Sequence, residues 1–174
     1  MLNLIIMKTI ITFVLFQFIS ITAYCCQCNQ LNIDSLQKVS YRSSDFIFLG
    51  EVEYVDTINK VSILNIFEIY KGNINLKKVY VKNVHSCNFL PYDKGLWIVY
   101  SKFINDSTIE VNTCGASRSN LCPYKISSYN LPPPPRNNQE ISKIKFEMEF
   151  LSLKLEAILE WNNELYKLRN GLMK

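Results

Sequence analysis

The sequence predicts a mainly β domain with appended helices: a five-stranded barrel, with a short helix before it and a long helix after it. Three observations support this fold class. Five runs rich in Val, Ile, Phe, Tyr and Thr alternate with turn signals between residues 46 and 113. A capping residue followed by spaced apolar side chains precedes them, which indicates a short helix. Residues 138–170 then carry apolar side chains at heptad spacing.

The short helix is expected just after the first cysteines. Asp34 is a good N-cap, and Leu36, Val39 and Tyr41 can line one apolar face. Five strands are expected after it, at residues 46–55, 61–70, 79–81, 96–100 and 108–113.

Two features refine the strands. Gly50 inside the first strand predicts a bulge or bend, and Asn59-Lys60 predicts a hairpin turn between the first two strands. Five strands in a small domain favour the oligonucleotide/oligosaccharide-binding (OB) barrel. A sandwich is the alternative, although it usually has more strands.

The chain after residue 122 changes composition. Residues 123–137 are expected to form a stiff, proline-rich linker, because they contain Leu131-Pro132-Pro133-Pro134-Pro135. Asn137 and Glu140 resemble a capping box that opens the helix at 138–170, and Gly171 is a plausible stop. The apolar heptad positions are Ile141, Ile144, Met148, Leu151, Leu155, Ile158, Leu165 and Leu168, with Asn162 among them.

This helix allows two interpretations. A regular heptad stripe with a buried Asn162 predicts self-association through helix 138–170 as a coiled coil. Phe146, Phe150 and Leu159 broaden the stripe, which favours packing of the helix on its own domain instead. Both remain open at the level of sequence.

The amino terminus resembles a secretory leader. About a dozen nearly continuous apolar residues at 10–21 follow the basic Lys8, which suits a signal peptide better than a membrane span of roughly 20 residues. Residues 1–25 are therefore expected to be removed, with cleavage after Cys25 or after Ala23. The protein is expected to be secreted or extracytoplasmic. A lipid anchor to the cell envelope at Cys25 is the alternative, although Tyr24 departs from the lipidation motif.

Composition and cysteine usage narrow the function classes. The net charge is only +4 and the basic residues are scattered, so no nucleic-acid partner is expected. Six cysteines in an exported chain indicate disulfides; four thiolates could otherwise hold zinc. His85 is the single histidine, and neighbouring Cys87 is a strong disulfide candidate. We therefore expect no enzymatic activity, no cofactor and no metal of its own.

The order of motifs carries a family resemblance. Cys26-Gln27-Cys28 is followed by an amphipathic helix, the run Ser44–Val52, the triplet Tyr70-Lys71-Gly72, Cys87, the strand Gly95–Tyr100 and Cys114. Residues 26–122 resemble the amino-terminal domain of the tissue inhibitors of metalloproteinases (TIMP), a netrin-like module. The short secreted microbial relatives of that module are the most similar.

The resemblance implies disulfides Cys26–Cys87 and Cys28–Cys114. Each would close a long loop and contribute about 4 kcal/mol in the chain-entropy model. Cys25 and Cys122 remain. Cleavage after Ala23 would keep Cys25 as a partner for Cys122, whereas cleavage after Cys25 would leave Cys122 unpaired.

The resemblance also implies two functions. The first is an extracellular, non-catalytic protein-binding domain, because the netrin-like barrel serves as an interaction module. The alternative is inhibition of a zinc metalloendopeptidase. In that family the α-amine and carbonyl of the terminal cysteine, here Cys26, occupy the open zinc position, and the next side chain, here Gln27, enters the specificity pocket. Gln27 departs from the small hydroxyl residue usual there. Any residue retained before Cys26 would convert its amine to an amide and abolish the mechanism.

Overall fold

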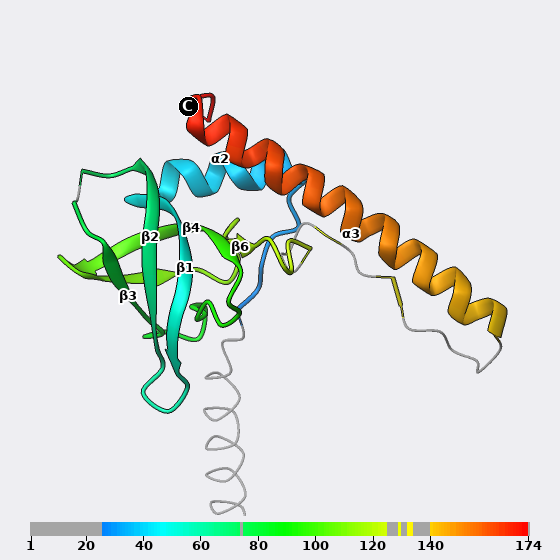
Figure 1. Ribbon diagram of the computed structural model, residues 1–174, viewed down its shortest axis with the longest axis horizontal. Helices are drawn as coiled ribbons and strands as arrows, with labels where there is room; N and C mark the ends of the chain where they lie inside the picture. Colours follow the sequence, from blue (N-terminus) through cyan, green and yellow to red (C-terminus); the bar gives the residue numbers. More distant parts are fainter. Residues whose placement is uncertain (1–25, 74, 125–128, 130–131, 134–139, 174) are drawn as a thin grey trace, which may run out of the picture.

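The computed structural model describes residues 26–73, 75–124, 129, 132–133 and 140–173. The expected leader 1–25 with Cys25, the capping residue Asn137 and most of linker 123–137 lie outside the described residues. The described chain forms a five-stranded closed β-barrel with a short helix before it and a long helix after it (Figure 1). The predicted fold class is therefore confirmed.

The barrel closes through one antiparallel and one parallel contact between strands distant in sequence. Its strands are β1 (Phe46–Asp56), β2 (Val61–Lys71), β3 (Lys78–Lys82), β4 (Leu96–Asn105) and β5 (Thr108–Val111). They follow the order β1-β2-β3-β5-β4, and β4 pairs back to β1. The β3–β5 pair is parallel and the other pairs are antiparallel. All five predicted strands are present. β4 runs five residues further than predicted, to Asn105, and the ends of the other strands differ by one or two residues.

A further strand, β6 (Arg118–Ser119), pairs with β4 outside the barrel and was not predicted. Two residues are too few to show a period, so no sequence pattern distinguishes this strand from a loop.

The predicted bulge and hairpin are both present. The β1–β2 register shifts between Leu49 and Gly50, and a Cβ at position 50 would lie 2.6 Å from the carbonyl oxygen of Asn65. Only glycine permits that approach without a backbone shift. In the hairpin, the Asp56 carboxylate accepts bonds from two backbone N–H groups, and Lys60 adopts φ 54°.

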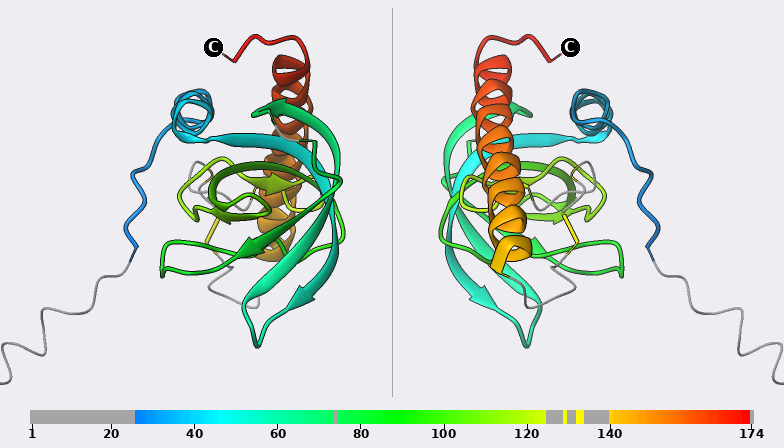
Figure 2. Two further views of the ribbon diagram at one scale, coloured as in Figure 1. Left: turned by 90° about the vertical axis from the view of Figure 1, so that its left-hand side faces the viewer. Right: turned by 90° about the vertical axis from the view of Figure 1, so that its right-hand side faces the viewer.

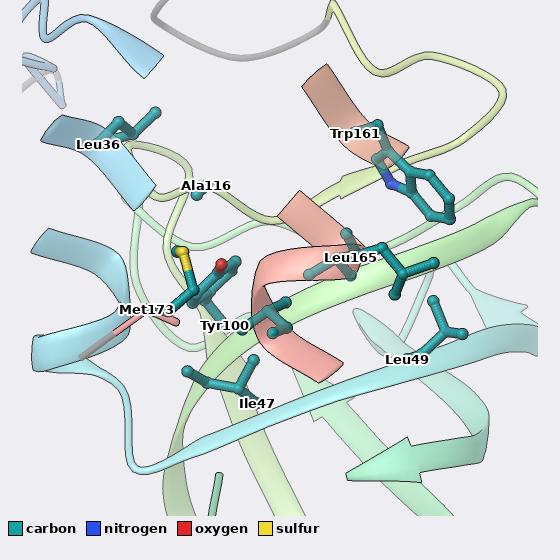
Figure 3. Packing of buried hydrophobic residues seen from close by; sticks show 10 residues of the cluster. Leu36, Ile47, Leu49, Tyr100, Ala116, Trp161, Leu165 and Met173 are labelled. Carbon is teal, nitrogen blue, oxygen red and sulfur yellow. The ribbon is translucent and has the colours of Figure 1, made fainter. Parts of the chain in front are cut away.

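Two hydrophobic cores share strands β1 and β4. The barrel interior contains Phe46, Phe48, Val52, Leu64, Val79, Val81, Trp97, Val99, Ile109 and Val111. The outer faces of the same two strands pack against both helices (Figure 3). That second core contains Leu36, Ile47, Leu49, Ile98, Tyr100, Ala116, Trp161, Leu165, Leu168 and Met173. Burial on both faces explains why the first part of each strand, Phe46–Leu49 and Leu96–Tyr100, is continuously apolar.

The short helix α2 (Ile33–Ser43) starts earlier than predicted. Asn32, not Asp34, is its N-cap, because the Asn32 side chain accepts the N–H of Ser35 at 2.8 Å. Asp34 lies in the first turn, where an acidic group favours the helix dipole. The predicted apolar face is also partly wrong: Leu36 is buried, whereas Val39 is 53% exposed.

The long helix α3 (Glu140–Arg169) lies along the barrel (Figure 2), and its amino-terminal half extends beyond it (Figure 1). Gly171, at φ 65°, ends it as predicted: its N–H and that of Leu172 donate to the carbonyls of Leu168 and Lys167. This is a Schellman motif.

The carboxy-terminal half of α3 packs against the barrel of its own chain, but the buried residues are not only those of the predicted heptad positions. Its buried residues are Ala157, Trp161, Glu164, Leu165 and Leu168. Asn162 is exposed and donates to the carbonyl of Ile158, so the expectation that it lies in a buried seam is not met within this chain. Leu159 was expected to broaden a buried face, yet it is 63% exposed.

Candidate functional site at the disulfide-pinned amino terminus

Two disulfides tie the first described residues to one rim of the barrel. Cys26 pairs with Cys87 across a Cα–Cα distance of 5.3 Å, and Cys28 pairs with Cys114 across 5.1 Å. These are the two pairings that the family resemblance implies. They span 61 and 86 residues, so a segment that would otherwise fray is fixed at two points.

The barrel-side cysteines lie close to each other: Cys87 is within the β3–β4 connection, and Cys114 follows the end of β5. The N–H of Thr113 donates to the Cys87 carbonyl at 2.8 Å, and the N–H of Cys114 donates to the Asn112 side chain at 2.7 Å. Asn88 and Asn112 also form an isolated bridge. As a result the two disulfides are neighbours: Cys26 Sγ lies 3.7 Å from Cys114 Sγ.

Gln27 is exposed between the two half-buried cysteines. Because each neighbour is covalently bound to the barrel, the backbone at Gln27 has little freedom. An exposed side chain on such a backbone can contact a partner without the entropy loss that ordering a loose terminus requires.

A groove of about 370 Å³ lies beside this segment. Its apolar wall is formed by Leu31, Leu36 and Val39, which accounts for the exposure of Val39. Its polar lining comes from the amino-terminal segment, α2 and the barrel rim: Cys26, Gln27, Asn29, Ser40, Ser43, Cys87, Asn112, Cys114 and Gly115. A second cavity of about 180 Å³ shares Ser40, Ser43, Asn112 and Gly115 and is also lined by Lys102 and Glu110.

Hydrogen bonds hold α2 in place as the wall of the groove. The Ser40 hydroxyl accepts the N–H of Ala116 at 3.0 Å, which ties α2 to the segment after Cys114. Lys71 donates to the carbonyls of Tyr41 and Ser44, at 2.7 and 2.6 Å. These bonds satisfy carbonyls at the end of the helix. The α2 wall of the groove is therefore fixed to the barrel, and the Ser40 hydroxyl is already occupied by its hydrogen bond to Ala116.

Disulfide formation bears on two alternatives among the described residues, a Cys–His pair and a thiolate metal site. The Cys87 sulfur is in a disulfide, so it offers no thiolate to exposed His85. Sulfurs of Cys26, Cys28 and Cys114 lie within 4.8 Å of one another, a spacing that thiolates around a metal can also have. All three belong to disulfides, and metal binding would require their reduction.

Cys122 is half-buried and pairs with no other cysteine among the described residues. It lines a different cavity of about 180 Å³, together with Phe89, Trp97 and Arg118. Its backbone N–H donates to the Ser119 hydroxyl at 3.2 Å. Cys25, its candidate partner, lies outside the described residues, so the Cys25–Cys122 pairing stays a prediction.

A buried polar network anchors α3 behind the groove, and sequence reasoning missed it. Glu164 forms an ion pair with Arg118 and accepts hydrogen bonds from Tyr100 and Gln37. Both charged side chains are completely buried. Burial raises the pKa of Glu164, and burial beside that carboxylate raises the pKa of Tyr100. The four residues come from four elements, and no local sequence pattern connects them.

Two further observations bear on the setting of the site. The disulfides indicate an oxidising, extracytoplasmic environment. In the part of the chain that the structure describes, every helix is too short or too polar to cross a bilayer.

Comparison of the sequence with protein-family models and with curated proteins finds no match.

Proposed function

We propose that this protein is a secreted, disulfide-stapled extracellular protein-binding module of the TIMP/netrin-like type, without catalytic activity. One observation carries the proposal: exposed Gln27 is held between two bridges to the barrel rim, beside a groove of about 370 Å³. A partner segment could contact Gln27 and place an apolar side chain against Leu31, Leu36 and Val39.

The rigidity of this rim favours binding over catalysis. Residues of a preorganised surface lose little conformational freedom on association, so more of the contact energy appears as affinity. Polar groups of the groove and of the adjoining cavity are partly engaged with one another: Asn88 donates to Glu110 at 2.9 Å, and Ser43 and Ser44 donate to the Ser40 carbonyl. Because these polar groups already bond to one another, we expect the groove to recognise a partner mainly by its shape and by apolar contacts.

Site-specific photo-crosslinking tests this function. A photoreactive residue placed at Gln27 is expected to crosslink an extracellular protein from the fluid into which this protein is secreted. The matched control places the same group at Gln30, which is also exposed but lies beyond the two bridged cysteines. Crosslinking at Gln27 should be lost in Cys28→Ser/Cys114→Ser protein. Equal capture at Gln27 and Gln30 would contradict a partner site at the pinned segment.

Inhibition of a zinc metalloendopeptidase is the second candidate function. The observation that favours it is the bridge of Cys26 itself to Cys87, which would hold a free α-amine and carbonyl of Cys26 in a fixed position. Such a pair can displace the water at a catalytic zinc.

A one-residue extension separates the two functions. Protein beginning at Cys26 should inhibit a zinc endopeptidase that cleaves a fluorogenic peptide, and protein with one alanine before Cys26 should not. If the alanine-extended protein no longer inhibits the protease but still crosslinks at Gln27, the free α-amine of Cys26 is the group that binds the zinc. Absence of inhibition by both forms, across a panel of such proteases, would leave only the interaction module.

A further inference from the structure

The first two thirds of α3 carry an apolar stripe that the rest of the described chain does not cover. The stripe consists of Ile144, Met148, Leu151, Leu155, Ile158 and Leu159, whose exposed fractions range from 42% to 67%. These residues recur every three or four positions, so they lie on one face of the helix. Their span of sixteen positions corresponds to about 24 Å of helix. Contiguous exposed apolar residues of this kind mark an interaction site.

The stripe is distinct from the face that holds α3 on the barrel. That other face carries Ala157, Trp161, Glu164 and Leu168, which are buried against the barrel. Phe150 belongs to the same side, where its ring contacts Tyr124. Because α3 already packs through one face, the stripe is not part of the core that the described residues form.

We propose that the stripe binds a second copy of this chain, with the two α3 helices antiparallel. In one antiparallel register every core layer is apolar: Ile144 faces Leu155 of the partner subunit, and Met148 faces Leu151 of the partner subunit. This pairs heptad a positions with d positions, as in antiparallel coiled coils. Exposed Asn162 then falls opposite position 137, before α3 begins, and stays outside the interface.

Charge complementarity on both flanks supports the antiparallel direction. In the same register Lys145 lies near Glu156 of the partner subunit, and Glu147 lies near Lys154 of the partner subunit. Each pair occurs twice by symmetry. In a parallel pair Lys154 would instead meet Leu159 of the partner subunit, and Glu147 would meet Ser152 of the partner subunit.

The Lys145–Glu156 flank is the clearer one to test. Lys145 is 76% exposed at its side chain and makes only a long intrahelical contact of 3.9 Å with Glu149. Lys154, in contrast, lies 4.7 Å from the ring centre of Phe150, and it would have to leave that contact. The antiparallel arrangement also places the two barrels at opposite ends of the helix pair.

Sedimentation equilibrium of the secreted protein over a wide concentration range tests the dimer. The wild-type chain is expected to dimerise reversibly. Leu151→Glu places a charge in a central layer and should raise the dissociation constant at least about tenfold. Ile58→Glu, on the β1–β2 hairpin where Ile58 is 90% exposed, should leave it unchanged. A wild-type chain that stays monomeric at every concentration, or a Leu151→Glu chain that dimerises equally well, overturns the proposal.

Charge reversal tests the direction of the helices. Lys145→Glu and Glu156→Lys should each weaken the dimer roughly threefold to tenfold, because each replaces two attractive pairs by two repulsive ones. The double variant should regain wild-type affinity, since both pairs are restored with opposite sign. A double variant as weak as the singles overturns the antiparallel arrangement. Circular dichroism of every variant should show unchanged helix content.

Discussion

At the scale of single residues, the buried ion pair Arg118–Glu164 governs how α3 is attached. Glu164 is fully buried and satisfied by Arg118, Tyr100 and Gln37, so its removal would leave an unpaired guanidinium inside the protein. Glu164→Ala is expected to lower the free energy of unfolding by about 3–5 kcal/mol in urea titrations.

Two controls distinguish a buried charge from a lost contact. Arg118→Met with Glu164→Met removes both charges, so the double variant should be more stable than Glu164→Ala by several kcal/mol, a difference of the order seen when buried pairs are replaced by apolar residues. Glu53→Ala breaks the exposed pair with Lys78 and should cost less than about 1 kcal/mol. Equal losses for Glu53→Ala and Glu164→Ala would contradict the importance of burial.

At the scale of elements, two partly exposed ion pairs tie the carboxy-terminal end of α3 to α2 and β2. Lys167 pairs with Asp34, and Arg169 pairs with Glu68. Hydrogen bonds from these cations hold the pKa values of Asp34 and Glu68 below their usual range. A lowered carboxyl pKa stabilises the fold above the unfolded value of about 4, and this contribution is lost as the pH falls through the lower folded value.

Glu164 has the opposite dependence. Because burial raises its pKa, the folded state binds a proton more tightly than the unfolded state does. Its contribution is therefore greatest below about pH 4 and decreases as the pH rises toward the raised folded value. A measurement of whole-protein stability would mix the two effects, so a local probe is needed.

Hydrogen exchange of the last turns of α3 provides that local probe. Below about pH 4, protection of residues 165–169 should decrease in the wild-type chain after correction for intrinsic exchange rates. Asp34→Asn/Glu68→Gln should show lower protection at neutral pH and no further loss on acidification. The Glu164 network is intact in both proteins. An identical acid response in the two proteins would rule out the ion pairs as its source.

At the scale of the whole molecule, the disulfides attach the amino-terminal segment to a barrel that is already closed by its strands. Cys28→Ser/Cys114→Ser opens a loop of 86 residues and should reduce the free energy of unfolding by about 4–5 kcal/mol in the chain-entropy model. Thermal unfolding measures this loss, and limited proteolysis should find new cleavage near residues 26–32. In protein that begins at Cys26, Cys122→Ser is the matched control, because no described cysteine pairs with Cys122 and Cys25 is absent, and it should change neither result. Unchanged stability of the double variant would show that the bridge does not restrain the unfolded chain.

Much of the barrel was predictable because its signals are local. Apolar runs and alternation define the strands, and Lys60 and Gly171 occupy positions with positive φ, which few residue types adopt readily. Gly50 marks the bulge because a side chain there would collide with the carbonyl of Asn65. The pairing of Cys26 with Cys87 and of Cys28 with Cys114 came from the order of motifs along the whole chain, since spacing alone permits other pairings.

The sequence by itself determined the strands, the turns and the extent of a long amphipathic helix, because each depends on residues a few positions apart. Only the tertiary structure decided that Asn32 caps α2, that Arg118 meets Glu164, and which face of α3 the barrel buries. These outcomes depend on surfaces brought together from distant parts of the chain. In α3 several faces are apolar enough to be buried. The buried face is the one that fits the surface of the barrel and brings Glu164 to Arg118.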